Sequence, residues 1–144
     1  MRAALDEAEA AFERGEVPIG AVLVEDKSGE IAARAGNRTL EMSDPSAHAE
    51  MLCIRHACAQ AWAQRIPGHT LYVTLEPCPM CAAALAYARI GRIVFGARDT
   101  KSGGLINGPA LSDSGVIHHS FDIVEGSLAE ECSALLKDFF KARR

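Results

Sequence analysis

The chain passes from a predicted strand into a predicted helix through Thr74-Leu75-Glu76-Pro77-Cys78-Pro79-Met80-Cys81. Two cysteines separated by two residues can place two thiolates on one tetrahedral metal ion. A third ligand is available upstream at His48, which is followed two residues later by Glu50. A catalytic zinc ion takes three protein ligands and keeps one position open. His48, Cys78 and Cys81 therefore form a candidate catalytic zinc site, with Glu50 beside it to carry protons.

Segments with helical and strand patterns alternate on both sides of this stretch. Asp44-Pro45 is a helix-start signal that would place His48 in a first turn, and Ser127 with Glu130 forms a capping box. Strands that alternate with helices indicate an α/β fold, here a three-layer α/β/α sandwich with a mixed five-stranded sheet. The predicted order is helix 2–14, strand 17–25, strand 31–35, helix 46–63, strand 69–75, helix 80–88, strand 90–96, strand 121–124 and a last helix through 128–140.

Length and composition restrict the class of protein. The 144 residues, with 49% hydrophobic and 24% charged residues, predict one globular domain spanning 1–144. No apolar run reaches the roughly 18–20 residues of a membrane helix, and acidic residues interrupt the N-terminus where a signal peptide would be apolar. A cytoplasmic protein without membrane contact is therefore expected. The net charge of −4 argues against a general nucleic-acid binder, so an RNA partner would need a local basic patch.

The cysteine pattern agrees with metal binding in a reducing compartment. The chain has five cysteines, an odd number, and two of them form the C-x-x-C pair. The other three, Cys53, Cys58 and Cys132, lie on apolar helical faces and are expected in the core.

The predicted zinc site suits the hydrolysis of an aminated heterocycle. Zinc lowers the pKa of water in its open position toward neutrality, and the resulting hydroxide can attack an electrophilic carbon. One carboxyl group beside the metal can then move protons from that water to a ring nitrogen and to departing ammonia, which is the role expected of Glu50. H-x-E followed by P-C-x-x-C is the signature of the zinc nucleobase deaminases.

The similarity extends well beyond the motif. The chain resembles bacterial tRNA-specific adenosine deaminases over almost its whole length, although residues 105–119 have no firm match and the family usually has a few residues before the first helix. The segments that carry the resemblance are Glu16-Val17-Pro18-Ile19-Gly20-Ala21-Val22-Leu23-Val24, Gly36-Asn37-Arg38, Ala47-His48-Ala49-Glu50, Leu71-Tyr72-Val73-Thr74-Leu75-Glu76-Pro77-Cys78, Ile93-Val94-Phe95-Gly96-Ala97-Arg98-Asp99 and Asp138-Phe139-Phe140.

The resemblance implies a cytidine-deaminase-like fold, a homodimer, and conversion of the wobble adenosine of a tRNA anticodon to inosine. It implies one Zn²⁺ per subunit on His48, Cys78 and Cys81, with Glu50 as the proton shuttle. Asn37 would hold the adenine edge, and Asp99 would lie near the flanking ribose. The other residues that it assigns to substrate binding are Ala49, Leu75, Pro77, Arg98 and Phe139.

Other interpretations remain open at this level. The C-x-x-C pair also occurs in structural zinc knuckles and redox proteins, Glu50 could be an ordinary acidic residue of a first helical turn, and Asn37 could be a turn residue. A deaminase of a free base or nucleoside, of guanine or cytosine type, would use the same zinc chemistry, and an inactive zinc-stabilised binding module is a third hypothesis. The basic end of the last helix would contact phosphate or simply be solvated: Lys137, Lys141, Arg143 and Arg144.

Overall fold

One mixed sheet forms the centre of residues 1–143, the part of the chain that this computed structural model describes. The strand order is β2-β1-β3-β4-β5, in which β1 is antiparallel to both of its neighbours and β3, β4 and β5 are parallel. In chain order the elements are α1 (Arg2–Glu13), β1 (Gly20–Glu25), β2 (Ile31–Gly36), α2 (Ala49–Ala61), β3 (His69–Leu75), α3 (Pro79–Tyr87), β4 (Arg92–Ala97), β5 (Asp122–Glu125) and α4 (Ala129–Lys141).

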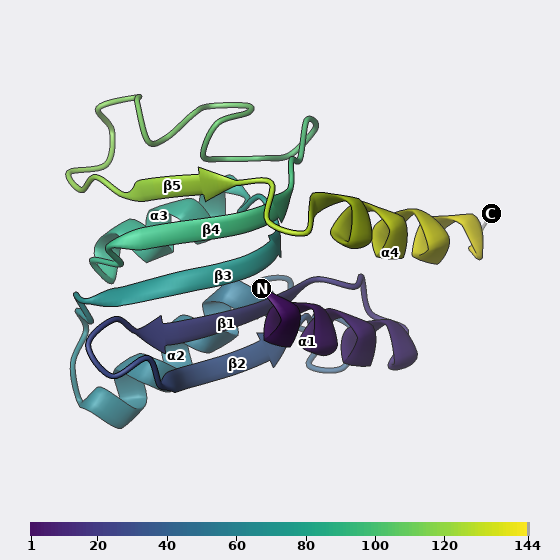
Figure 1. The fold of residues 1–144 in the computed structure, drawn as a ribbon, viewed down its shortest axis with the longest axis horizontal. Coiled ribbons are helices and arrows are strands. Elements are labelled where there is room, and N and C mark those ends of the chain that lie inside the picture. Colours follow the sequence, from purple (N-terminus) through teal and green to yellow (C-terminus); the bar gives the residue numbers. More distant parts are fainter. Residues whose placement is uncertain (144) are drawn as a thin grey trace.

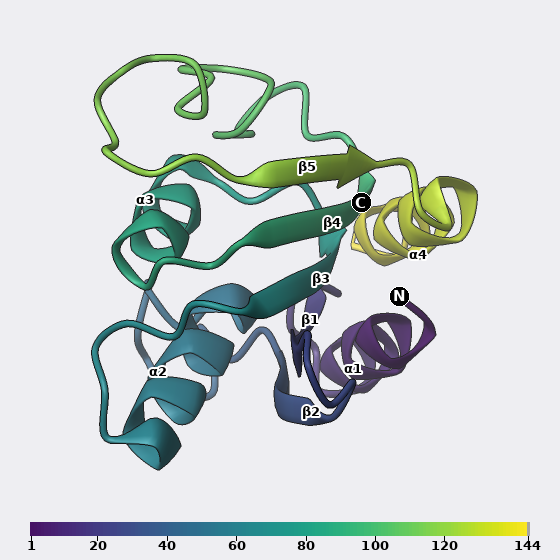
Figure 2. The same ribbon diagram turned by 60° about the vertical axis from the view of Figure 1, so that its left-hand side comes forward.

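The helices cover both faces of the sheet and make it a three-layer sandwich, as the sequence predicts. In Figure 1 and, after rotation, in Figure 2, α1 and α4 lie on one face while α2 and α3 lie on the other. Because β3 and β4 are parallel, their carboxyl ends meet at one edge, where Leu75 pairs with Ala97. The turn that carries the C-x-x-C pair leaves the sheet from this edge. None of the described helices is long and apolar enough to cross a membrane.

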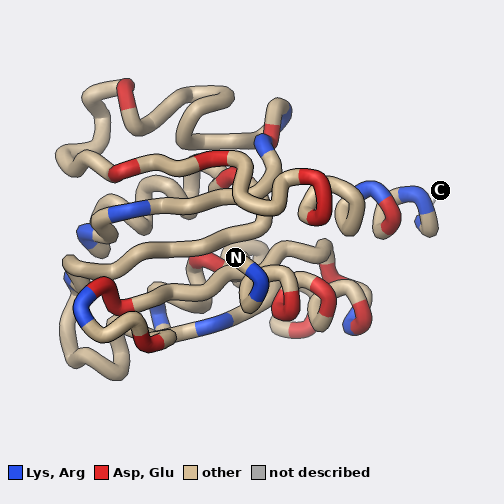
Figure 3. The backbone as a smooth tube through the Cα atoms, in the orientation of Figure 1, with Lys and Arg blue, Asp and Glu red and all other residues tan. Residues whose placement is uncertain are grey.

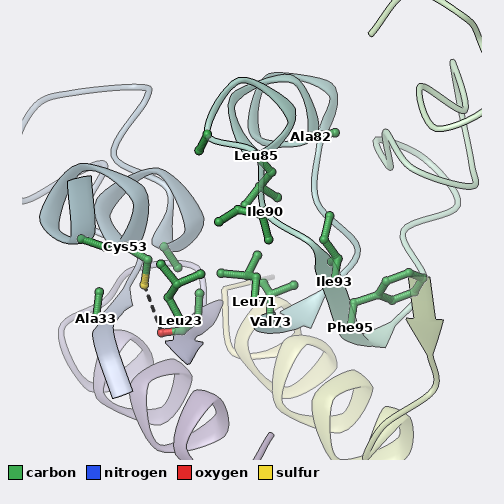
Figure 4. Packing of buried hydrophobic residues seen from close by; sticks show 14 of the residues in the cluster. Leu23, Ala33, Cys53, Leu71, Val73, Ala82, Leu85, Ile90, Ile93 and Phe95 are labelled. Carbon is green, nitrogen blue, oxygen red and sulfur yellow. Dashed lines mark hydrogen bonds between the residues drawn. The ribbon is translucent and has the colours of Figure 1, made fainter. Parts of the chain in front are cut away.

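The core lies mainly between the sheet and the α2–α3 layer. Figure 4 shows aliphatic and aromatic side chains of β1, β3 and β4 packed together, among them Leu23, Leu71 and Phe95, all of which are fully buried. Cys53 projects from α2 into this cluster, and its thiol donates a hydrogen bond to the Ala21 carbonyl at 3.4 Å. Cys53 and Cys132 are buried as expected, whereas Cys58 is half-buried.

The N-termini of three helices differ from the sequence prediction: α3 begins at Pro79, one residue early, and the starts of α2 and α4 have identifiable causes. Helix α2 begins at Ala49 rather than near residue 46, since the Asp44 carboxylate accepts hydrogen bonds from the Ser46 amide (2.8 Å) and hydroxyl (2.7 Å) and closes a turn before the helix. Ser127 does not cap α4. Its amide instead donates to the Phe95 carbonyl at 3.3 Å and prolongs the pairing with β4, so the helix starts one residue later than expected.

Candidate active site

The three predicted metal ligands come together at the N-termini of α2 and α3. His48 is the N-cap residue of α2 and Cys78 is the N-cap residue of α3, both with extended backbone, and Cys81 lies in the first turn of α3. The Nδ1 atom of His48 is 3.7 Å from Sγ of Cys78 and 3.6 Å from Sγ of Cys81. Helix N-termini favour negative charge, so both cysteines lie where a thiolate is stabilised.

The spacing of the three ligand atoms fits a tetrahedral zinc ion. Zinc–sulfur and zinc–nitrogen bonds of about 2.3 and 2.1 Å at a tetrahedral angle separate S and N by about 3.6 Å. The two measured S–N distances agree with this value, and the ligand atoms of His48, Cys78 and Cys81 all lie within 4.8 Å of one another. A site with three protein ligands leaves a fourth position open, which is the arrangement of a catalytic rather than a structural zinc ion.

Glu50 is buried beside the ligands and lacks a partner for one of its oxygens. Within residues 1–143, its Oε2 atom is the only buried side-chain oxygen or nitrogen that has no hydrogen-bond partner. A buried acceptor of this kind is costly unless a donor joins it, and water in the open position beside three metal ligands is such a donor. Burial, with the negative charge of Cys78, raises the pKa of Glu50 to about 7. A carboxyl group with this pKa can both accept and donate a proton at neutral pH.

The two thiols differ sharply in acidity without a metal ion. The hydrogen bond from Cys81 lowers the pKa of Cys78 to about 4, assisted by His48 and opposed by burial. The same hydrogen bond, together with burial and the negative charge of Glu50, raises the pKa of Cys81. A metal ion binds thiolates, so binding at both sulfur atoms must release the proton that Cys81 retains.

Asn37 and Ala49 are joined directly at the start of α2. The Asn37 side-chain oxygen accepts a hydrogen bond from the Ala49 amide at 2.9 Å, and both residues are buried. Asn37 thus caps the first free N–H group of α2, and it fixes its own amide group next to the helix turn that carries Glu50. From the sequence, Asn37 could also have been a simple turn residue. In the structure it makes a specific contact with the first residue of α2.

Arg98 and Asp99 take part in contacts within the protein. Arg98 forms a two-point ion pair with Glu125, with nitrogen–oxygen distances of 2.6 and 2.7 Å. The Asp99 carboxylate accepts hydrogen bonds from the amides of Lys101 (3.0 Å) and Ser102 (2.9 Å). Both side chains therefore shape the segment that follows β4, beside the carboxyl end of β3.

Leu75 and Pro77 flank the turn between β3 and α3. Leu75 is half-buried at the end of β3, and Pro77 is buried with its carbonyl accepting a hydrogen bond from the Gly104 amide at 2.8 Å. The chain after β4 is thereby tied to the metal-ligand turn.

Phe139 corrects one prediction, because its side chain is only 3% exposed and so cannot meet a base. Its ring packs edge-on against Phe12 at 5.5 Å between centroids, and the Arg143 guanidinium lies 3.7 Å above it. The neighbouring Phe140 is 49% exposed. At helical spacing only one of two adjacent rings can face α1, and the structure turns Phe139 inward.

Two buried acidic residues near the site were not singled out from the sequence. Glu16 accepts hydrogen bonds from the Thr39 hydroxyl and from the amides of Leu40 and Glu41, at 2.9–3.1 Å. Glu76 accepts hydrogen bonds from the segment after β4. In the sequence, the available signal for each of these residues was a carboxylate next to an apolar strand. Its hydrogen-bond partners could not be identified there, because they lie 23 to 31 residues further along the chain.

Comparison with protein families gives the chemical class. The model of the MafB19-like deaminase family matches residues 1–144. Together with three candidate metal ligands beside a buried carboxyl group, this match defines the class of protein as a deaminase.

Individual relatives narrow the class. The tRNA-specific adenosine deaminases of Agrobacterium fabrum (strain C58) and Bacillus subtilis (strain 168) are 49% and 48% identical to this chain, over all of it and over 93% and 88% of their own lengths. The chain therefore belongs to the family of tRNA-specific adenosine deaminases, which confirms the resemblance drawn from the sequence.

Solved structures agree with this assignment. A structure from work on A-to-I editing by tRNA:A34 deaminases at the wobble position of transfer RNA has a TM-score of 0.91 and 48% identity, covering 94% of this chain and 97% of its own. A guanine deaminase from Nitrosomonas europaea has a TM-score of 0.82 at 23% identity, covering 94% of this chain and 80% of its own. At that identity the second match shows a shared fold alone.

Proposed function

We propose that the protein converts adenosine to inosine at the wobble position of a tRNA anticodon, with water as co-substrate and ammonia as the second product. The observation that carries the proposal is the grouping of His48, Cys78 and Cys81 beside the buried Glu50, one of whose oxygens has no hydrogen-bond partner. The family assignment selects adenosine in tRNA over a free base of guanine or cytosine type.

The three ligand residues would hold one Zn²⁺ per subunit. Zinc in such a site supplies a nucleophile, because it lowers the pKa of water toward neutrality. Glu50 would accept one proton from the attacking water and donate it to the ring nitrogen next to the amino-bearing carbon. As the bond between that carbon and the amino group breaks, it would accept the remaining hydroxyl proton and donate it to the departing ammonia. Burial raises the pKa of Glu50 to about 7 in the metal-free protein, so the carboxyl group is poised to exchange protons near neutral pH.

Asn37 is proposed to orient the base. Its side-chain oxygen is already occupied by the Ala49 amide, so the side-chain NH₂ group is left to donate to a purine nitrogen. A base entering this site would have to leave its stack, which costs less from an anticodon loop than from a duplex.

A basic groove along α4 supports an RNA partner. A groove of about 890 Å³ is lined by Lys101, Leu136, Lys137, Phe140, Lys141 and Arg143. Figure 3 shows lysine and arginine at the C-terminal end of α4, whereas its first turn is acidic. Cations follow the phosphate backbone, and the exposed Phe140 ring offers a face on which a base can stack. Arg144, the last predicted member of this basic end, lies outside the described residues.

We extend the proposal to a homodimer in the cytoplasm. The α2–α3 layer exposes large apolar side chains, with Tyr87 75% and Trp62 95% exposed, and exposed apolar groups are typical of protein interfaces. A cytoplasmic location agrees with a tRNA substrate and with cysteines that must stay reduced to bind metal.

The first experiment is a deamination assay on zinc-loaded protein with an anticodon stem-loop carrying a wobble adenosine, beside free adenine, adenosine, guanine and cytosine. Inosine in the RNA alone supports the proposal, and ammonia from a free base with the RNA unchanged overturns the substrate. Glu50→Gln should lower kcat by a factor of about 10³ or more and keep its zinc, because the amide cannot carry a proton. Glu30→Gln, at an exposed turn, is the matched control and should keep full activity.

A further inference from the structure

The carboxylate of Glu76 is enclosed by N–H donors from a single loop, residues 99–107, here called the Glu76 loop. Oε1 accepts hydrogen bonds from the amides of Ile106 (2.8 Å) and Asn107 (2.9 Å). Oε2 accepts hydrogen bonds from the Asp99 amide (3.2 Å) and from the Asn107 side-chain nitrogen (2.6 Å). The donors come from both ends of the loop, so the Glu76 carboxylate holds these two ends together.

These N–H groups are the direct partners of a buried negative charge. Glu76 is only 2% exposed, and within residues 1–143 no lysine or arginine nitrogen forms an ion pair with it. A buried carboxylate without a cation needs every hydrogen bond that it receives. The loop conformation and the charge of Glu76 therefore depend on each other.

The closed loop lies directly against the metal-ligand turn. The Gly104 amide donates to the Pro77 carbonyl at 2.8 Å, and a Cβ atom on Gly104 would come within 2.5 Å of the Pro79 nitrogen and 2.7 Å of the Cys78 carbonyl carbon. Such an approach is open only to glycine. A Cβ atom on Gly103 would likewise lie 2.6 Å from the Glu76 carboxyl carbon.

The same loop supplies one wall of the basic groove. Lys101 lies between the two clamped ends and lines the groove opposite Lys137, Lys141 and Arg143 of the α4 segment. Its backbone amide donates a hydrogen bond to the Asp99 carboxylate at 3.0 Å, which fixes the turn at the start of the Glu76 loop. The position of the Lys101 side chain in the groove is thus set by a loop that closes on Glu76.

We propose that Glu76 is a positioning residue for RNA binding: by closing the Glu76 loop against the Cys78–Pro79 backbone, it holds Lys101 in the basic groove. This inference rests on the proposed RNA substrate. It assigns to Glu76 no contact with the RNA or with the metal ion, and its effect is expected in substrate binding rather than in the chemical step.

A double-mutant cycle between Glu76 and Lys101 tests the proposal. In the zinc-loaded protein Lys101→Ala should raise KM for the stem-loop about fivefold, the size of one exposed charge contact. Glu76→Gln keeps the shape of the side chain but points an NH₂ group at N–H donors, and should raise KM by about tenfold while kcat changes by less than about threefold. In the Glu76→Gln background Lys101→Ala should add less than about twofold, because Lys101 is already displaced.

The controls separate the possible failures. Lys27→Ala, in the exposed turn after β1, should leave KM unchanged in both backgrounds, and zinc content should stay equal to that of the parent. An equal effect of Lys101→Ala in both backgrounds, or loss of zinc from Glu76→Gln, overturns the role of Glu76 while the proposed function stands. A parent protein that leaves the RNA unchanged overturns the proposed function itself.

Asn107→Ala provides a milder variant if Glu76→Gln does not fold. It removes one donor to Oε2, at 2.6 Å, and leaves the carboxylate and three backbone hydrogen bonds in place. It should raise KM in the same direction by a smaller factor and show the same reduced response to Lys101→Ala. A variant with normal KM and an undiminished Lys101 effect would overturn the positioning role.

Discussion

At the scale of single residues, the thiols of the candidate metal site differ in acidity from each other and from the core cysteines. Cys78 has a pKa of about 4 because of its hydrogen bond from Cys81, whereas burial raises the pKa of Cys53 far above its usual range. Cys78 is half-exposed and Cys53 is buried. The metal-free protein should therefore have one reactive thiolate at neutral pH, and it is a ligand of the predicted zinc site.

This gives a prediction for alkylation of the metal-free protein. After chelation, iodoacetamide should modify Cys78 at a rate that changes little between about pH 6 and 8, since the thiolate already predominates above its lowered pKa. An ordinary thiol of pKa about 8.5 would react roughly tenfold faster per pH unit over the same range. Peptide mapping by mass spectrometry identifies the modified cysteine.

Zinc supplies the control for this experiment. Adding it back before the reagent should protect Cys78 and Cys81 together, because both sulfur atoms become ligands. A rate at Cys78 that follows pH like an ordinary thiol would contradict the hydrogen bond from Cys81, and modification that zinc does not slow would contradict the ligand set.

At the scale of elements, the sequence predicts the order of helices and strands but misplaces the starts of α2 and α4. Asp44-Pro45 and Ser127 are local signals for a helix start, yet Asp44 closes a separate turn with Ser46 and Ser127 pairs with β4. At Asp44 the acceptor that could cap a helix closes a local turn instead, whereas the outcome at Ser127 depends on a strand that is distant in the sequence. The grouping of His48, Cys78 and Cys81 was predictable, because a zinc ion would require these residue types at this spacing. The contacts of Glu16 and Glu76 were not, since no rule of spacing links a buried acid to amides 23 to 31 residues away.

The packing of α1 on β1 leads to a second prediction. A Cβ atom on Gly20 would lie 2.0 Å from the Ala4 carbonyl oxygen and 2.5 Å from the Ala8 amide nitrogen. Gly20→Ala must push the helix away from the strand, and overpacking of this kind destabilises by about 1–3 kcal/mol. Urea unfolding should show a lower midpoint with a similar m-value.

Gly91→Ala is the matched control, because its Cβ atom would meet only the His69 carbonyl oxygen at 3.8 Å, an ordinary contact. Its free energy of unfolding should stay within about 0.5 kcal/mol of that of the parent. Equal stability of the Gly20 and Gly91 variants would mean that α1 does not approach β1 as closely as the structure indicates.

At the scale of the whole molecule, charge is distributed unevenly along the fold. The chain carries a net charge of −4, and Figure 3 shows acidic residues on α1, β5 and the start of α4. The cations that line the groove at the other end of α4 make this part of the described surface suited to phosphate. An acidic protein with such a basic groove should bind RNA through few phosphates and in a preferred orientation, since its acidic surfaces repel the rest of the RNA.

This distribution predicts the salt dependence of RNA binding. Each phosphate neutralised on a single strand contributes about −0.7 to the slope of log K against log salt concentration. Replacing Lys137 and Lys141 by alanine should therefore make the slope shallower by about 1.4 and weaken binding of every stem-loop tested, whatever the sequence outside the wobble adenosine. Filter binding between about 50 and 200 mM salt measures both effects. Lys27→Ala, at the opposite end of the sheet, should leave the slope unchanged. If the double variant kept the parental slope, the RNA backbone would have to lie on another surface, and the basic end of α4 would be an ordinary solvated helix terminus.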